Sequence, residues 1–357
     1  MDLLSILGGK GSSTLPVVAP WQDASTLSPA IAAAEALGIA LSSAPLNRAA
    51  AIQVPAVARS RNLIVGAGAP LPLRALDANG VARTQPTFLY RSNSLENPYD
   101  RMVWTLDDLL FHGLSLWALE RGARTSGSAH GPILDAVRVP WDRWQIRNGQ
   151  IEVVVKPGGG MEVVDAEDVL LFNGPTNGLL NDARDTLRAA QAIEAAYVDR
   201  AQNPIPITVI RHQQGSEVVL EQDEVTGTDG VLTQWREARR QPGGTIGYLP
   251  PGLQMETPGH DAQALLQDAR NAVRIDVANH VGLPVALIDG GVAEDSMTYR
   301  NAQGEVSRFY GDLKFWLDPI QHRLSMDDVV PRGQRVRFDL SEFDTPAPEP
   351  TGVPTED

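Results

Sequence analysis

The chain has 357 residues, 43% hydrophobic and 21% charged, a balance typical of globular rather than disordered proteins. Its formal net charge of −14 argues against tight binding to DNA phosphates, because proteins that grip DNA present a basic surface. The absence of cysteine excludes disulfides, thiolate zinc sites and thiol catalysis, and is typical of assembly in a reducing compartment. No apolar run is long enough to predict a membrane span, and the N-terminus lacks the pattern of a secretory signal.

The N-terminal half predicts a loosely ordered arm over 1–46 and then an α+β unit over 47–180. Pro55 suits a first helical turn, where its missing N–H costs no hydrogen bond, so a helix is predicted over about 55–66. Apolar residues recur at helical spacing over about 99–112 and predict a second helix. Short runs bounded by Gly or Pro predict the strands Leu71–Leu76, Leu114–Glu120, Ile133–Val139, Gln150–Lys156 and Val169–Phe172, in a mostly antiparallel or mixed sheet.

Two long helices are predicted further along the chain, over 181–203 and 259–283, and a β-rich segment over 204–258 separates them. Helices of about 20 residues span roughly 30 Å. Their apolar stripes are narrow and rich in Ala, which suits close packing against neighbouring helices, including those of other subunits. An ordinary antiparallel helix pair in a monomeric core is the alternative.

A loop is predicted over 284–300, because Gly and Pro end the preceding helix. A third helix follows over 301–326, and Pro319 within it should kink or break it. The remaining residues, 327–357, are rich in Pro and acidic residues towards their end, and we expect a partly disordered C-terminal tail.

No pattern in the sequence indicates an enzyme. Gly9–Ser12 resembles the end of a phosphate-binding loop, but the first glycine of that motif and the preceding strand are missing. The six histidines are scattered, so neither a metal nor a cofactor is predicted. Asp107 and Asp108 should point about 100° apart on a helix and are interpreted as solvated side chains. An enzyme with an unrecognised site is the rival hypothesis, and a deep pocket with convergent titratable groups would distinguish it.

Local patterns along residues 50–325 resemble, in order and spacing, those of the siphophage-type portal family of tailed bacteriophages. The chain is short for that family, and Leu171 stands where the family has His. The segments that carry the resemblance are Pro55–Ile64 with Leu71–Leu73, Asn97–Pro98, Leu109–Gly113, Val137–Trp144, Glu167–Phe172, Val281–Pro284, Ser296–Asn301 with Glu305, and Phe315–Ile320.

The resemblance implies a portal fold in a homododecameric ring around a channel for double-stranded DNA, which passes without sequence specificity. An acidic channel wall would repel phosphate and so would not hold the DNA. The crown would be minimal, and the helix over 301–326 would lie on the side of the wing and crown. The other implied parts are an α/β wing (47–180), a stem (181–203 and 259–283), a β-rich clip (204–258) and a channel loop (284–300).

The resemblance also implies partners and a location. Besides itself, the chain would contact the terminase large subunit, a head–tail adaptor and the major capsid or scaffold protein. It would be assembled in the host cytoplasm and would occupy the portal vertex of the virion, with no membrane partner and no cofactor. Another phage head–tail structural protein, such as an adaptor or a minor capsid protein, is the alternative.

Two groups of residues are candidate functional sites. The channel loop combines backbone freedom with net negative charge, and is therefore poorly suited to holding phosphate. A basic helix in the clip would contact an acidic partner. The alternatives are a surface loop without contact to DNA and a solvated amphipathic helix. The loop residues are Asp289, Gly290, Gly291, Glu294, Asp295 and Arg300, and the clip residues are Trp235, Arg236, Arg239 and Arg240.

Overall fold

The computed structural model describes residues 46–124, 130–154, 159–202, 209–212, 233, 253–256, 262–288 and 302–341. The chain divides into two compact units. Of the described residues, unit 1 contains those up to Leu187 and from Arg274 onward, and unit 2 contains those between. The division falls inside the two long helices, α6 (Arg184–Gln202) and α9 (Ala262–Val281), so each helix belongs partly to both units.

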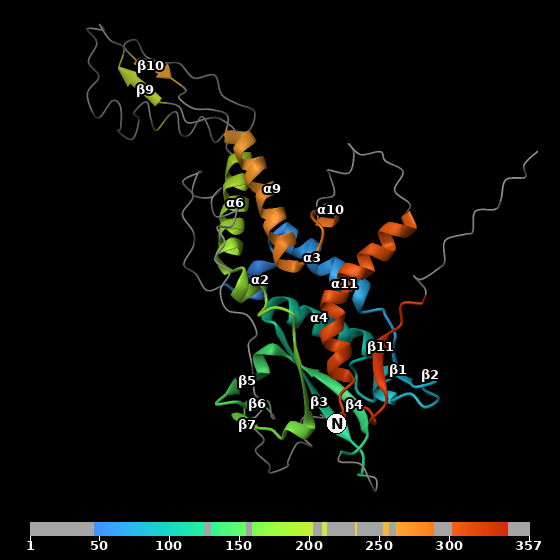
Figure 1. Ribbon diagram of the computed structural model, residues 1–357. Helices are drawn as coiled ribbons and strands as arrows, with labels where there is room; N and C mark the ends of the chain where they lie inside the picture. The colour runs from blue at the N-terminus through green and yellow to red at the C-terminus, as the bar shows by residue number, and fades with distance from the viewer. Residues whose placement is uncertain are drawn as a thin grey trace, which may run out of the picture. The chain divides into compact units, whose positions relative to one another are not determined.

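Helix α4 of unit 1 (Pro98–His112) begins and ends at local sequence signals. The Asn97 side chain accepts a hydrogen bond from the Asp100 N–H at the start of α4, and Gly113 ends that helix with a φ of +75°. In Figure 1, α3, α4 and α11 lie on one side of the strands. Besides parts of α6 and α9, unit 1 contains α2 (Arg48–Ala51), α3 (Pro55–Gly68), α4 (Pro98–His112), α5 (Leu179–Asp182), α10 (Val285–Ile288) and α11 (Ala302–Leu324).

Three antiparallel sheets make up the rest of unit 1, in the orders β4-β3-β8, β5-β6-β7 and β11-β1-β2. The strands predicted near β1, β3, β4, β6 and β8 are confirmed. Single-turn 3-10 helices connect some of them, at Thr87–Leu89, Trp141–Arg143 and Ala166–Asp168. The strands are β1 (Leu73–Asp77), β2 (Gly80–Val81), β3 (Leu114–Arg121), β4 (Ile133–Val139), β5 (Trp144–Arg147), β6 (Gln150–Val154), β7 (Met161–Val163), β8 (Val169–Asn173) and β11 (Arg335–Phe338).

Strand β11 is the largest departure from the sequence-based prediction in unit 1. It lies in the segment that was assigned to a C-terminal tail, and it pairs with β1, more than 250 residues earlier in the chain. Val336 and Phe338 face the core and are buried. The strand has only four residues, two of them arginines, and so short a period-2 pattern does not predict a strand without knowledge of its partner.

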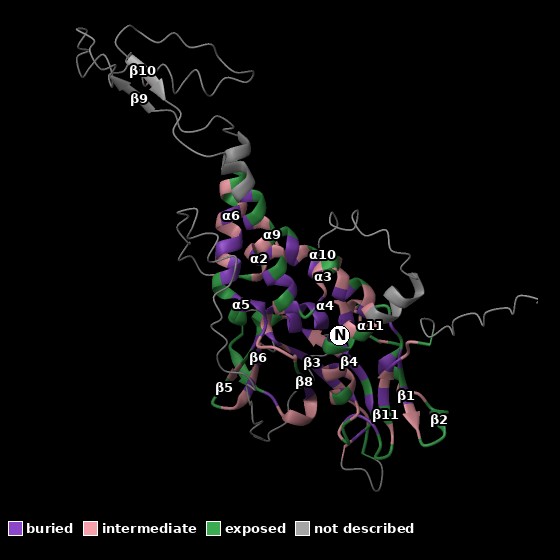
Figure 2. Ribbon diagram, turned by 45° about the horizontal axis from the view of Figure 1, so that its top comes forward, coloured by how far each residue is buried: buried purple, intermediate pink, exposed green. Residues whose placement is uncertain are grey.

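The core of unit 1 lies between α4 and the β4-β3-β8 sheet. Leu106 and Leu109 of α4 and Trp117 of β3 are fully buried, as the purple ribbon in Figure 2 shows for these elements. The Trp117 indole donates to the Thr105 hydroxyl at 2.7 Å, and its ring packs on Phe172 of β8. Burying these large side chains together stabilises the packing of α4 on the sheet by several kcal/mol in all, at about 25 cal/mol per Å².

Unit 2 contains most of α6 and α9 and a two-stranded antiparallel sheet of β9 (Val209–His212) and β10 (Leu253–Glu256). Figures 1 and 2 both show the two helices side by side. Arg270 of α9 donates to Glu194 of α6 at 3.0 Å and lies over the ring of Tyr197. Both strands lie within the segment 204–258, which the sequence predicts to be β-rich.

The third predicted helix is α11, and it is not broken at Pro319, which lies inside the helix. Pro removes one backbone donor without ending the helix here, because Trp316, Leu317 and Ile320 on either side are buried in unit 1. Among the described helices, none is long and apolar enough to cross a membrane.

Candidate functional site

The predicted site residues all lie outside the described part of the chain, but the structure describes both ends of the predicted channel loop. The predicted loop begins at 284, and its first described residues, Val285–Ile288, form the single-turn helix α10. The Leu287 N–H donates to the Pro284 carbonyl at 3.0 Å and closes that turn. The undescribed residues are Asp289, Gly290, Gly291, Glu294, Asp295 and Arg300 of the loop and Trp235, Arg236, Arg239 and Arg240 of the clip.

The turn between α9 and α10 is determined by its local sequence. Gly282 has a φ of +69°, a left-handed conformation that favours glycine. The Leu283 N–H donates to the Ala278 carbonyl at 3.1 Å, the bond that closes a Schellman motif, and the Leu283 side chain is buried. Pro284 follows and cannot continue α9. The chain therefore leaves α9 in a single defined direction.

Helix α11 holds the end of α9 in place. The buried indole N–H of Trp316 donates to the Val281 carbonyl at 2.9 Å, which gives this carbonyl at the end of the helix a partner. The ring of Phe315 lies against Gly282, with 3.4 Å between a ring carbon and the position that a Cβ would take. Two adjacent aromatic residues of α11 thus contact the α9–α10 turn and stabilise it.

Helix α10 is anchored on α3. Ile288 is buried, and the Arg59 guanidinium of α3 donates to the Leu287 carbonyl at 3.3 Å. The 13 residues from 289 to 301 connect α10 to α11 along the chain, and both helices belong to unit 1.

A buried ionic cluster on α4 corrects the interpretation of Asp107 and Asp108 as solvated side chains. The two side chains do diverge, but both are buried. Asp107 accepts from Arg48 and from Arg61, each with a contact of 2.8 Å, and Asp108 accepts from Arg138 at 2.8 Å. The arginines lie 59, 46 and 30 residues away in sequence, so no local pattern predicts these partners.

Burial shifts two titrations near this cluster. It raises the pKa of Asp108 to about 6, although the hydrogen bonds from Arg138 favour the charged carboxylate and lower this pKa. It lowers the pKa of His112 to about 4, and the imidazole stacks on Trp141 at a centroid distance of 4.0 Å. At neutral pH His112 is therefore uncharged and acts as an aromatic packing surface.

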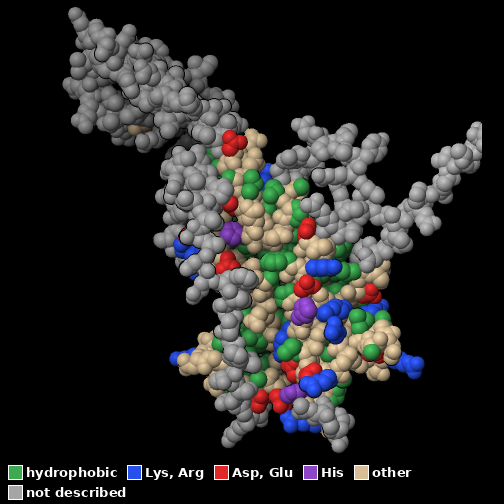
Figure 3. All heavy atoms as spheres, in the orientation of Figure 1, with side chains coloured by type: hydrophobic (Ala, Val, Ile, Leu, Met, Phe, Trp, Pro, Cys, Tyr) green, Lys and Arg blue, Asp and Glu red, His purple; other side chains and the backbone are tan. Residues whose placement is uncertain are grey.

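The aromatic residues around the cluster remain partly exposed. Trp104 lies beside both Arg48 and Arg138, at 5.4 and 5.2 Å from its ring centroid, and Trp104 and Trp141 are 39% and 37% exposed. Trp and Arg side chains of this kind are enriched in protein–protein interfaces. On the face of unit 1 in Figure 3, basic and acidic side chains are interspersed.

The described residues contain no group of three His, Asp or Glu side chains that could hold a metal ion. A cavity of about 420 Å³ between α3, β1 and α4 is lined mainly by Pro, Leu and Tyr, with Arg74 and Arg101. Neither a carboxylate nor a histidine lines it. It therefore lacks the convergent acid and base that would favour the enzyme hypothesis.

Comparison with solved structures gives matches over most of the chain. An HK97-family phage portal protein from Corynebacterium diphtheriae is 28% identical, with a TM-score of 0.67, and the match covers 86% of this chain and 100% of that one. A chain in the neck of an empty gene transfer agent particle is 18% identical, with coverages of 87% and 88% and a TM-score of 0.53. A chain in a native gene transfer agent virion is 17% identical, with coverages of 88% and 90% and a TM-score of 0.53.

No family model matches the sequence, and no curated protein is significantly similar to it. The two chains from gene transfer agent particles share the fold at low identity. The C. diphtheriae protein adds 28% sequence identity in a match that covers its entire length. In fold, and at 28% identity in sequence, the chain is therefore similar to a phage portal protein.

Proposed function

We propose that this protein is the subunit of a closed, twelve-fold ring at one vertex of a phage or phage-like capsid. The ring would surround the channel through which DNA is packaged and ejected. The observation that carries the proposal is the similarity to the C. diphtheriae portal protein, which covers all of that chain and 86% of this one. The neck of a native gene transfer agent particle, solved with C12 symmetry and 17% identical over 81% of this chain, supports the symmetry.

The described elements can be assigned to the parts of such a subunit. The sheets and helices up to Leu187 would form the wing, and α6 and α9 the stem. The β9–β10 pair would belong to the clip, which would dock the terminase and later the tail adaptor. The segment after α10 would enter the channel from its base on α3 and α11. The aromatic residues Trp104 and Trp141 would lie at contacts between subunits or with the capsid.

The ring proposal predicts a large closed oligomer. Twelve chains of 38.5 kDa give about 460 kDa, which light scattering or native mass spectrometry distinguishes from a monomer or dimer. Ring contacts are heterologous, so closure should produce discrete particles with a central hole under negative stain. A strict monomer or dimer at every concentration and salt, with capsid or scaffold protein present, would contradict the proposal.

The channel-loop proposal predicts a charge-dependent packaging defect. Replacing Asp289, Glu294 and Asp295 with Lys should leave the ring intact but slow DNA translocation, because the new cations bind phosphate. The defect should ease as salt rises and screens these contacts. Neutral Asn and Gln replacements at the same positions are the matched control and should have a smaller effect. Normal packaging by the Lys variant at low salt would show that the loop does not face DNA.

The clip proposal predicts a docking defect without loss of the ring. Reversing Arg236, Arg239 and Arg240 to Glu should abolish binding to an acidic surface of the terminase or adaptor, because attraction becomes repulsion. The same reversal at Arg83 and Arg332, two exposed arginines of unit 1, is the control and should leave docking unchanged. Co-sedimentation of rings with terminase measures the difference. Equal binding by both variants would count against a basic docking helix.

A further inference from the structure

The cavity of about 420 Å³ on unit 1 has the chemistry of a groove that binds proline-rich peptide. Tyr90 and Tyr99 both line it, and they are 57% and 50% exposed. Pro70 and Pro72, in the segment that leads from α3 into β1, also line it. Several domains bind polyproline II segments against exposed aromatic rings, and such segments are extended before binding and so lose little entropy.

The charge of the lining selects an acidic or carbonyl-rich occupant. The charged side chains that line the cavity are the basic Arg74 and Arg101, and no acidic side chain lines it. Arg101 is almost fully buried, and its terminal nitrogens donate to the carbonyls of Phe88 and Ala136. Its Nε has no hydrogen-bond partner among the described residues. A buried donor without a partner is costly, and the basic lining favours an occupant that carries acidic groups or carbonyl oxygens.

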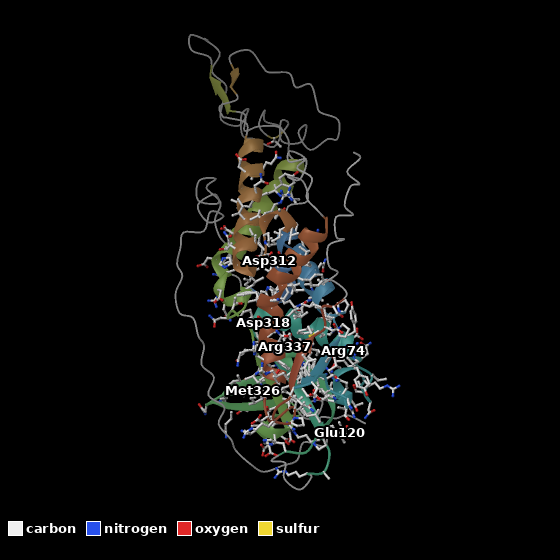
Figure 4. The ribbon with its side chains drawn as sticks, turned by 45° about the vertical axis from the view of Figure 1, so that its right-hand side comes forward. Arg74, Glu120, Asp312, Asp318, Met326 and Arg337 are labelled. Atoms are coloured by element: carbon white, nitrogen blue, oxygen red, sulfur yellow. The ribbon has the colours of Figure 1, made fainter. Side chains whose placement is uncertain are left out.

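The chain's own C-terminus leaves the fold at the rim of this cavity. Phe338 at the end of β11 pairs with Leu73, and the Asp339 N–H then donates to the Pro72 carbonyl at 2.8 Å. Arg74, labelled in Figure 4 beside its cross-strand neighbour Arg337, donates to the Asp339 carboxylate at 2.8 Å. The last described residues therefore run antiparallel to the segment that lines the cavity.

The 16 residues after Ser341 have the composition that the cavity favours. They contain four prolines and five acidic residues, and neither Lys nor Arg. Three of the prolines alternate with other residues in Thr345–Pro350, the sequence Thr-Pro-Ala-Pro-Glu-Pro. At about 3.1 Å per residue in polyproline II, the seven residues that follow Ser341, up to Pro348, reach roughly 20 Å. A tether this short also gives the segment a high effective concentration at the cavity.

We propose that the Pro346–Pro350 segment of the chain's own C-terminal tail docks in this cavity, against Tyr90 and Tyr99. Glu349 would lie in the field of Arg74 and Arg101. The docked tail would cover the exposed tyrosines and extend β11 along the β1 side of unit 1. This intramolecular site is independent of ring formation and of any role in a DNA channel.

Engineered cysteines test the proposal cleanly, because the chain has none of its own. A Tyr99→Cys, Ala347→Cys variant of the full chain should form an intramolecular disulfide under mild oxidation. A Val81→Cys, Ala347→Cys variant is the control, since Val81 on β2 is 59% exposed and lies outside the cavity lining. The disulfide between the cysteines at 99 and 347 should form at least about tenfold faster than the disulfide between those at 81 and 347. This difference is expected if the tail is docked in the cavity rather than free.

A second set of variants tests the role of the prolines. Replacing Pro346, Pro348 and Pro350 with Ala should slow closure of the Tyr99 pair to the control rate, whereas Pro354→Ala should not. Tyr90→Cys replaces Tyr99→Cys if the latter does not fold. Equal closure rates at the cavity and at Val81, or insensitivity to the three prolines, would overturn the proposal. Disulfides formed only between chains would overturn it too, because the occupant would then be a neighbour's tail.

Discussion

Asp107→Asn should lower the stability of unit 1 by about 3–5 kcal/mol, the usual cost of removing one member of a buried ionic network. Asp107 is 1% exposed and is the shared acceptor of Arg48 and Arg61. The amide cannot neutralise two guanidinium groups, so both cations would remain partly buried without a counter-charge. The thermal unfolding midpoint, measured by calorimetry at pH 7, should fall by roughly 2–4 °C for each kcal/mol.

The control for this prediction is an exposed pair of the same chemistry. Asp327 and Arg332 form an ion pair at 2.9 Å, but their side chains are 63% and 90% exposed. Asp327→Asn should therefore cost at most about 1 kcal/mol. Arg61→Gln in the Asp107→Asn background should add less than it does alone, because the two residues share one network. Similar unfolding midpoints for the two Asp→Asn variants would show that the buried cluster does not stabilise the unit.

Gly113→Ala should destabilise unit 1 by about 3 kcal/mol or more, through two additive causes. The first is backbone strain, since Gly113 has a φ of +75°, which costs a residue with a Cβ about 1–2 kcal/mol. The second is steric overlap, since the new Cβ would lie 2.5 Å from the Asn177 carbonyl carbon and 2.6 Å from the Thr176 carbonyl oxygen. Because those are backbone atoms, the overlap can be removed only if the chain moves. Such a movement would strain the hydrogen bond from the Gly174 N–H to the Gly113 carbonyl.

Gly333→Ala separates the two causes. Gly333 has a φ of +94°, but no atom lies within 4 Å of the position that its Cβ would take. It should therefore show the strain without the overlap, with a loss of about 1–2 kcal/mol. Urea unfolding monitored by tryptophan fluorescence measures both variants on one scale. If both glycine variants lose the same stability, the close approach of the 176–178 backbone to Gly113 is not rigid.

The elements that local sequence determines were predictable. Helix α4 begins at Asn97-Pro98 and ends at Gly113, and these residues act on the backbone within one turn of themselves. The same holds for the end of α9, where Gly282 and Pro284 end the helix. The order of such short patterns along the chain was also sufficient to indicate the portal family, which the comparison with the C. diphtheriae protein supports. The channel-loop and clip residues stay predictions.

The contacts that depend on distant partners were decided only by the tertiary structure. Nothing near Asp107 in sequence indicates that Arg48 and Arg61 bury it, and a charged helix position alone suggests solvation. Strand β11 exists because β1 provides its backbone partners, and the cavity beside it forms from segments as far apart as Pro70 and Tyr99. Such pairings bring together residues that are far apart in the sequence, which requires the closure of long loops of chain. Whether they form depends on the packing of the whole unit and not on a local sequence pattern.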